Sequence, residues 1–349
     1  MQTHIKGLNG EEKMKIDIFN HIFPKTYFDK MMAVNPNLKD IGKRARGVPV
    51  LVDLDARFRM MDTFDDYAQV ICLCAPPLEM LAEPDVTPEL AKVANDGMAE
   101  YVAKYPDRFP AFIASMPMNN PDAALLEIDR AINDLKAVGI QFFTSVNGKP
   151  LDLPEFKPLF AKMAQYDLPI WVHPTRGADV PDYNTETKSK YEIWWTLGWP
   201  YDTSAMMARL VFGGYFDDFP NLKIITHHMG GMIPYFEGRV GPGWGQLGAR
   251  TSDEDLSVIL KKLKKPHLEY FKMFYADTAM FGSLAGTICG LAFFGSDHVL
   301  FASDSPFDPE KGPGYIRSTI RVIDSLPISD EERQKIYEGN TRRILKLKG

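Results

Sequence analysis

Four segments of this chain share one pattern, a short apolar run that ends abruptly in a side chain able to bind a metal ion. They are residues 15–21, 168–173, 222–228 and 298–304, which end in His21, His173, the pair His227-His228, and Asp304. Only seven histidines occur in the chain, and four of them lie at these ends. Imidazole and carboxylate groups at the carboxyl ends of parallel strands are typical of the top face of a (β/α)₈ barrel.

The rest of the chain repeats the alternation that such a barrel needs. Helical patterns follow most of the β-type runs, at 87–105, 123–136, 154–165, 203–216 and 331–347. The eight β-type runs are about 15–20, 68–74, 110–117, 138–143, 168–173, 222–227, 272–277 and 298–303. Short strand–helix connections favour a closed parallel barrel. The Gly-rich fingerprint of an open dinucleotide-binding sheet is absent after the first run, which also favours the barrel. We therefore predict an α/β fold, a (β/α)₈ TIM barrel, with residues 1–349 as one domain.

Two insertions interrupt the regular alternation. Residues 22–65 separate the first two strands, and residues 174–202 separate the fifth strand from its helix. Both follow a strand, so we expect both to lie over the top face, where a barrel places its lid and its pocket.

Charge and composition exclude some classes of partner. The formal net charge is −6, and the basic run 261–265 has no stacking aromatic residues beside it, so nucleic-acid binding is not expected. The longest apolar stretches are shorter than the roughly 18 residues of a membrane span, and residues 1–15 lack the apolar core of a signal peptide. Three cysteines are too few for a disulfide framework. We expect a cytoplasmic protein with free thiols.

Each strand-end group has a structural interpretation when it is taken alone. His21 and His173 could be hydrogen-bonded structural histidines, and Asp304 could cap the turn that follows it. Four strand ends on one barrel face, however, converge on one axial region. The set therefore predicts an active site.

Several motifs resemble the amidohydrolase superfamily, and more closely its branch of aminocarboxymuconate-semialdehyde and dihydroxybenzoate-type decarboxylases. They are Ile-Asp-Ile-Phe-Asn-His-Ile-Phe-Pro at 16–24, Trp-Val-His-Pro at 171–174, His-His-Met-Gly-Gly-Met-Ile-Pro at 227–234 and Phe-Ala-Ser-Asp-Ser-Pro-Phe at 301–307. The likeness runs from about residue 16 to about residue 343.

The resemblance implies roles for individual residues. His21, His173 and Asp304 match metal ligands of that branch, and His228 matches its proton-transfer histidine. His227 is then expected to face away, because neighbouring residues on a strand point to opposite sides. Arg239 resembles an arginine that reaches the substrate of a neighbouring protomer, which makes a homodimer the expected assembly; the alternative for Arg239 is an ordinary surface salt bridge.

The first strand departs from the family pattern. Phe19 stands where the branch has a first His or Glu ligand, and phenylalanine cannot coordinate a metal ion. Three ligands still suit Zn²⁺, with Mn²⁺ or Fe²⁺ as alternatives, but a weakly bound or absent metal is also compatible with the sequence. Phe19 could instead form an apolar floor under a substrate ring.

The expected activity is non-oxidative decarboxylation of a small aromatic or dienoic acid, by protonation of the carbon that bears the carboxylate. His228 and Asp304 are the expected proton-transfer pair, and Trp194 and Trp195 are a candidate ring-stacking wall. One alternative is a metal-dependent hydrolase or hydratase of a related small compound, in which the same groups activate water. A metal-free or repurposed barrel is a second alternative.

Overall fold

A computed structural model describes residues 14–347. Eight parallel strands form one sheet in the order β1-β2-β3-β4-β7-β8-β9-β10. Their bounds are β1 Lys15–Ile22, β2 Tyr67–Leu73, β3 Ala111–Ser115, β4 Ile140–Phe143, β7 Ile170–His173, β8 Ile224–Thr226, β9 Tyr275–Asp277 and β10 Val299–Leu300. All eight predicted runs are strands, and β5 (Ser145–Val146) and β6 (Lys149–Pro150) form a separate small hairpin.

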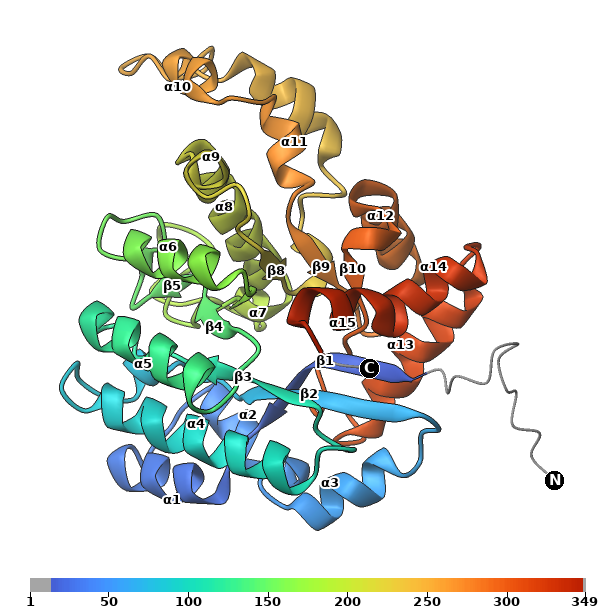
Figure 1. The fold of residues 1–349 in the computed structure, drawn as a ribbon. Helices are drawn as coiled ribbons and strands as arrows, with labels where there is room; N and C mark the ends of the chain where they lie inside the picture. The colour runs from blue at the N-terminus through green and yellow to red at the C-terminus, as the bar shows by residue number, and fades with distance from the viewer. Residues whose placement is uncertain (1–13, 348–349) are drawn as a thin grey trace.

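The sheet closes where β1 meets the segment that follows β10. The amide of Ile18 donates to the carbonyl of Phe301, and the amide of His21 donates to the carbonyl of Ser305, both at 2.9 Å. Figure 1 shows β1 beside the C-terminal elements, with helices around the outside. The predicted (β/α)₈ barrel is confirmed.

Helices cover the outer face of the barrel. The longer ones are amphipathic and pack apolar side chains such as Leu90, Ile128 and Ile323 against the sheet. Their bounds are α1 Lys25–Val34, α2 Ile41–Arg46, α3 Leu54–Met61, α4 Thr87–Lys104, α5 Pro121–Asn133, α6 Lys157–Tyr166, α7 Ile193–Thr196, α8 Gly198–Phe212, α9 Tyr215–Asp218, α10 Ser257–Lys262, α11 His267–Phe271, α12 Leu284–Phe294, α13 Pro313–Ser325, α14 Asp330–Gln334 and α15 Asn340–Leu345. A second core, which includes Ile18, Val70 and Trp171, fills the barrel interior.

Local sequence signals explain where several helices begin. Asn120 caps α5 by accepting a hydrogen bond from the amide of Ala123, and Pro121 occupies the first turn. Ser329 and Glu332 form a reciprocal capping box at the start of α14. The predicted helix 331–347 is helical from Asp330 to Leu345, and the π-helical turn η7 (Lys335–Gly339) lies between α14 and α15 within it.

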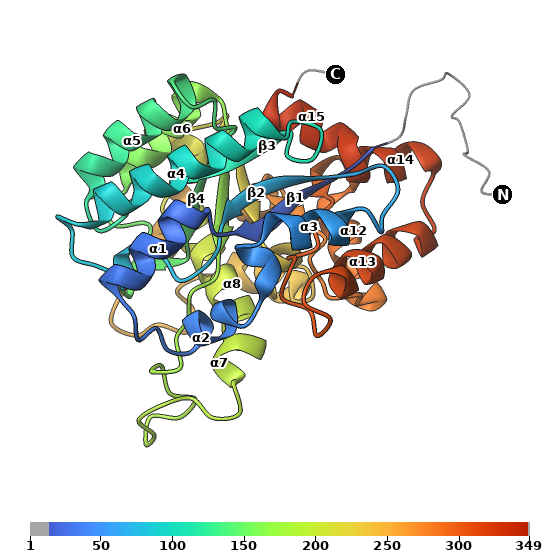
Figure 2. The same cartoon turned by 90° about the horizontal axis from the view of Figure 1, so that it is seen from below.

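The two insertions lie at one end of the barrel. Residues 22–65 form α1, α2, the short turn η1 (Pro49–Leu51) and α3, while residues 174–202 include α7 and the start of α8. Figure 2 shows α2 and α7 gathered at the end opposite α15. No helix within residues 14–347 is long and apolar enough to cross a membrane. The single-domain organisation stays a prediction, and the expectation about a signal peptide concerns residues that mostly lie outside the described range.

Candidate active site

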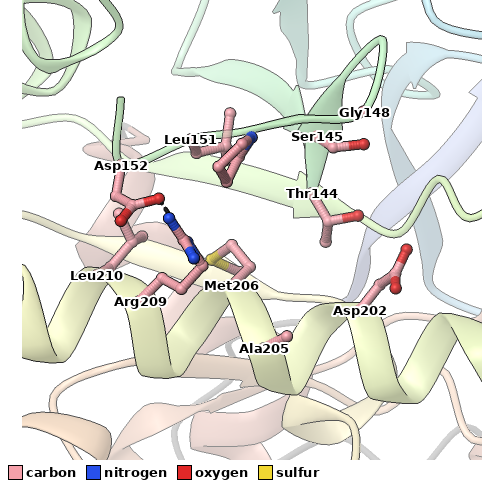
Figure 3. Close-up of a pocket in the computed structure, with 11 residues that line it drawn as sticks. Thr144, Ser145, Gly148, Leu151, Asp152, Asp202, Ala205, Met206, Arg209 and Leu210 are labelled. Atoms are coloured by element: carbon pink, nitrogen blue, oxygen red, sulfur yellow. Dashed lines mark hydrogen bonds and ion pairs between the residues drawn. The ribbon is translucent and has the colours of Figure 1, made fainter. Parts of the chain in front are cut away.

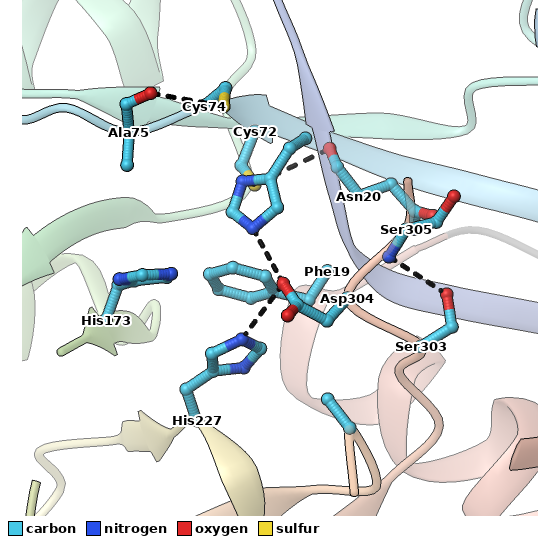
Figure 4. A network of polar contacts seen from close by, with 12 residues as sticks. Phe19, Asn20, Cys72, Cys74, Ala75, His173, His227, Ser303, Asp304 and Ser305 are labelled. Atoms are coloured by element: carbon cyan, nitrogen blue, oxygen red, sulfur yellow. Dashed lines mark hydrogen bonds and ion pairs between the residues drawn. The ribbon is translucent and has the colours of Figure 1, made fainter. Parts of the chain in front are cut away.

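Four side chains converge where the strands end. One ligand atom from each of His21, His173, His227 and Asp304 lies within 4.8 Å of those of the other three. Asp304 is central, because its Oδ1 lies 2.9 Å from Nε2 of His21 and 3.3 Å from Nε2 of His227. Figure 4 shows the imidazoles of His173 and His227 directed toward the Asp304 carboxylate. All four groups are buried.

The local backbone explains how β1 and β10 present their ligands. The register between β1 and β2 shifts between Asp17 and Asn20, so a bulge turns the end of β1 before His21 pairs with Cys72. Asp304 has φ of +61°, a left-handed conformation that aspartate tolerates better than most residues. Unusual backbone conformations of this kind occur often at functional sites.

His227 is the clearest correction to the sequence-based expectation. It was expected to face away from the site, but its ring belongs to the cluster and its Nδ1 contacts the carboxylate of Asp277. β8 ends at Thr226, and His228 has φ of +54°, so strand alternation no longer applies at the pair. His228 lies beside the cluster, with its ring 3.8 Å from that of His227 and 5.1 Å from that of Phe281.

Each of the three clustered histidines contacts an outer partner through Nδ1, which leaves Nε2 for the centre. Nδ1 of His173 lies 2.5 Å from the carbonyl oxygen of Pro174, and Nδ1 of His21 lies 3.5 Å from Sγ of Cys72. Nε2 of His227 is buried and, apart from its ion pair with Oδ1 of Asp304 at 3.3 Å, has no hydrogen-bond partner among the described residues. Three imidazole nitrogens and one carboxylate that converge in a buried centre are a donor set that fits a divalent metal ion.

Electrostatics separates the protonation states within the cluster. Burial alone would lower the pKa of His227, but the charges of Asp277 and Asp304 outweigh it and raise this pKa to about 10. Burial, together with the positive charge of His227, lowers the pKa of His228 to about 4 and that of His173 well below its usual value. Burial would raise the pKa of Asp304, yet the His227 charge and the His21 hydrogen bond hold it well below its usual range. Without a metal ion, these shifts favour a charged His227 beside a neutral His228, a neutral His173 and an ionised Asp304.

Phe19 packs beneath the histidines. Its ring stacks on His227 at 4.1 Å and meets the edge of His21 at 5.0 Å, and only 1% of its surface is exposed. It offers no donor atom, and it is not among the residues that line the cavity described next. The suggested contact between Phe19 and a substrate ring stays a prediction.

A cavity of about 800 Å³ opens above the cluster and reaches His21, His173 and Asp304. Its walls come largely from the two insertions, as expected. Trp194 and Trp195 line it, as does Arg44, whose Nη2 donates to the carbonyl oxygen of Phe307 at 2.7 Å. Tyr191 and Trp199 of the second insertion add further aromatic surface. Aromatic side chains from outside the insertions complete the wall, namely Phe281, Phe307 and Tyr315. This volume is typical of small-molecule sites.

Asp277 was not among the predicted site residues, although it supports the cluster. Asp277 orients His227 and accepts hydrogen bonds from the amides of His228 and Ala279, both at 3.0 Å. Its position at the end of a β-type run was the available signal.

Arg239 is exposed in the turn η4 (Arg239–Gly243) and does not line the cavity of its own chain, so its role toward a neighbouring protomer stays a prediction.

A smaller hollow of about 210 Å³ lies between the segment after β4 and helix α8 (Figure 3). Arg209 and Asp152 form an ion pair at 2.6 Å on its wall. None of the predicted site residues lines it.

Comparisons with known proteins agree with the geometry of the cluster. Residues 53–347 match the amidohydrolase family. This chain belongs to that family. Gamma-resorcylate decarboxylase from Rhizobium sp. (strain MTP-10005) is 31% identical over 309 residues, which cover 86% of this chain and 89% of the relative.

Two further relatives extend the likeness. The 2-amino-3-carboxymuconate-6-semialdehyde decarboxylase of Dictyostelium discoideum is 26% identical over 350 residues, covering 96% of this chain and 92% of the relative. The crystal structure of a dihydroxybenzoic acid decarboxylase from Polaromonas sp. JS666, with bound manganese and the inhibitor 2-nitroresorcinol, matches with a TM-score of 0.77 and 27% identity, covering 96% and 98% of the two chains. The predicted decarboxylase branch of the amidohydrolases is thereby confirmed.

Proposed function

We propose that this chain is a non-oxidative decarboxylase of a small aromatic acid, and that gamma-resorcylate or a close relative is its substrate class. The observation that carries the proposal is the buried cluster of three histidines and Asp304 at the base of an aromatic-walled cavity. The named decarboxylase relatives, which align with most of the chain, support the same reaction.

The proposed metal site consists of His21, His173, His227 and Asp304, so His227 supplies the fourth ligand that Phe19 does not. When bound, the divalent ion would supply fixed positive charge that grips anionic oxygens of the substrate and orients the ring. Three imidazoles and a carboxylate suit both zinc and manganese. Bound manganese in the Polaromonas relative favours manganese, so the zinc expectation takes second place.

The residues of the cavity bind and orient the acid. Trp195 and Phe281 stack at 6.2 Å and offer an aromatic surface against which a ring can pack. Lys43 and Arg44 add positive charge to the same wall, which attracts a carboxylate before it reaches the cluster.

In the reaction, the carbon that bears the carboxylate takes up a proton. The carbon–carbon bond then breaks, its electron pair returns to the ring, and CO₂ leaves. We assign proton transfer to Asp304, which lies at the cavity floor between two imidazoles. Its ionised carboxylate first takes a proton from a substrate hydroxyl and then delivers that proton to the carbon, and the phenolate product regains a proton from water. His228 assists because its Nδ1 lies 2.7 Å from the carbonyl oxygen of Ala279; donation to that oxygen leaves a neutral Nε2 that can accept a hydrogen bond from a substrate hydroxyl.

We also propose that the protein acts as a cytoplasmic homodimer. Tyr235 and Phe236 expose 78% and 39% of their surfaces close to Arg239. Exposed aromatic residues beside an arginine are typical of protein interfaces. Light scattering should give twice the chain mass of 39.4 kDa, and Tyr235→Ser should shift the protein toward monomer.

Product analysis tests the decarboxylase assignment. The Mn²⁺-loaded protein is incubated with gamma-resorcylate, and CO₂ and the phenolic product are measured together. Equal amounts of CO₂ and resorcinol support the proposal. An acid product without CO₂ would favour the hydrolase or hydratase alternative, and absence of turnover across hydroxybenzoates in a protein that binds no metal would favour the repurposed barrel.

A further inference from the structure

The ring orientation of a metal-binding histidine depends on the partner of its other nitrogen. The partner commonly is a carboxylate or a carbonyl oxygen, which holds the proton on Nδ1 and leaves the Nε2 lone pair for the metal. His227 has Asp277 in this position, and His173 has the carbonyl of Pro174. His21 is different, because its Nδ1 faces the thiol of Cys72.

The strand register places this thiol. His21 and Cys72 are paired residues of the parallel strands β1 and β2, and Cys72 is fully buried in the barrel interior. In Figure 4, Cys72 lies beside the uppermost imidazole, on the side of that ring away from Asp304. Cys72 is not one of the four clustered residues, and the clustered residue that its sulfur contacts is His21.

The direction of the hydrogen bonds follows from the partners of the sulfur. Sγ of Cys72 lies 3.5 Å from Nδ1 of His21 and also 3.5 Å from the carbonyl oxygen of Asn20. The carbonyl oxygen only accepts, so it takes the single thiol proton. The sulfur lone pairs can then accept a proton on Nδ1 when Nε2 of His21, which lies 2.9 Å from Oδ1 of Asp304, gives up its own proton to bind a metal ion.

We propose that Cys72 is a positioning residue for His21: its thiol bridges Nδ1 of His21 and the carbonyl of Asn20, and thereby stabilises the ring with its proton on Nδ1 when Nε2 binds the metal ion. This inference rests on the metal site of the proposed function. A side chain that can both donate and accept is required at residue 72, so serine should substitute for cysteine whereas alanine should not.

Metal titration is the first test. Mn²⁺ is titrated calorimetrically into metal-free protein, without substrate. We expect Cys72→Ala to raise the Kd roughly 10-fold, the lower end of the usual range for loss of an outer partner, and Cys72→Ser to stay within about 3-fold of the wild type. Cys74→Ala is the matched control, because Cys74 is also buried, contacts the carbonyl of Ala75 and, among the described residues, makes no hydrogen bond with a histidine. The proposal is overturned if Cys72→Ala binds like the wild type, or if Cys74→Ala weakens binding equally.

The same titration separates this proposal from the function on which it rests. If the wild type itself binds no Mn²⁺, the metal site of the proposed function fails. If the wild type binds Mn²⁺ and Cys72→Ala binds it equally well, the metal site stands and the role of Cys72 is refuted. Recovery of affinity in Cys72→Ser distinguishes the hydrogen bond of residue 72 from a general loss of packing.

Discussion

Glu79 is a buried carboxylate whose ionisation should destabilise the fold in a predictable pH range. It lies in the turn η2 (Leu78–Met80), exposes 5% of its surface, and its Oε1 has no hydrogen-bond partner among the described residues. Burial disfavours the charged form and raises the pKa of Glu79 from 4.5 to about 7. The replacement Glu79→Gln keeps the shape of the side chain and removes the charge.

The magnitude follows from the two pKa values. Because the folded-state pKa is the higher one, the folded state retains the proton after the unfolded state has lost it, so stability decreases as pH rises from about 4.5 through 7. Between pH 5 and pH 8 the wild type should lose about 2.5 kcal/mol of unfolding free energy that the Gln variant retains.

Urea unfolding at pH 5, 6.5 and 8, followed by tryptophan fluorescence, measures this difference. Glu83→Gln is the control, since Glu83 is an exposed carboxylate close by, and its effect should stay within about 0.5 kcal/mol at every pH. If the stability difference between wild type and Glu79→Gln does not change with pH, the carboxylate is not held in the buried, unpaired state described here.

Three further predictions concern the site. Asp304→Asn should lower kcat at least about 100-fold and reduce bound Mn²⁺, measured by steady-state kinetics and elemental analysis, whereas retained turnover would exclude Asp304 as proton donor. Asp277→Asn should weaken Mn²⁺ binding 10- to 100-fold in calorimetry, because an amide NH₂ in place of Oδ2 would face Nδ1 of His227 and move the ring proton to Nε2; unchanged affinity would contradict this. Trp195→Ala should raise KM about 10-fold with little change in kcat, while Leu197→Ala, an exposed neighbour in the same insertion, should change neither.

The strand positions could be predicted because apolar runs mark buried strands, and the alternation with helices then leaves few topologies. Contacts at helix ends were less predictable. The helix expected at 87–105 is α4, and Oγ1 of its first residue, Thr87, donates to Oδ1 of Asn119, which is distant in sequence.

Three of the four clustered groups, His21, His173 and Asp304, were recognised as strand-end ligands. His227 was missed because strand alternation was extended past Thr226, where the backbone leaves the strand and the next residue adopts positive φ. The cavity wall could not be predicted, since loop paths depend on long-range contacts such as the hydrogen bond from Arg44 to Phe307.

The central claim is that this site protonates the carbon that loses CO₂. The most direct measurement is turnover of gamma-resorcylate by the Mn²⁺-loaded protein in D₂O, with mass spectrometry and NMR of the product and a protein-free control for exchange. The account predicts CO₂ and resorcinol that carries one deuterium on the carbon between its two hydroxyls. A product that retains its carboxylate, or resorcinol without deuterium at that carbon, would contradict it.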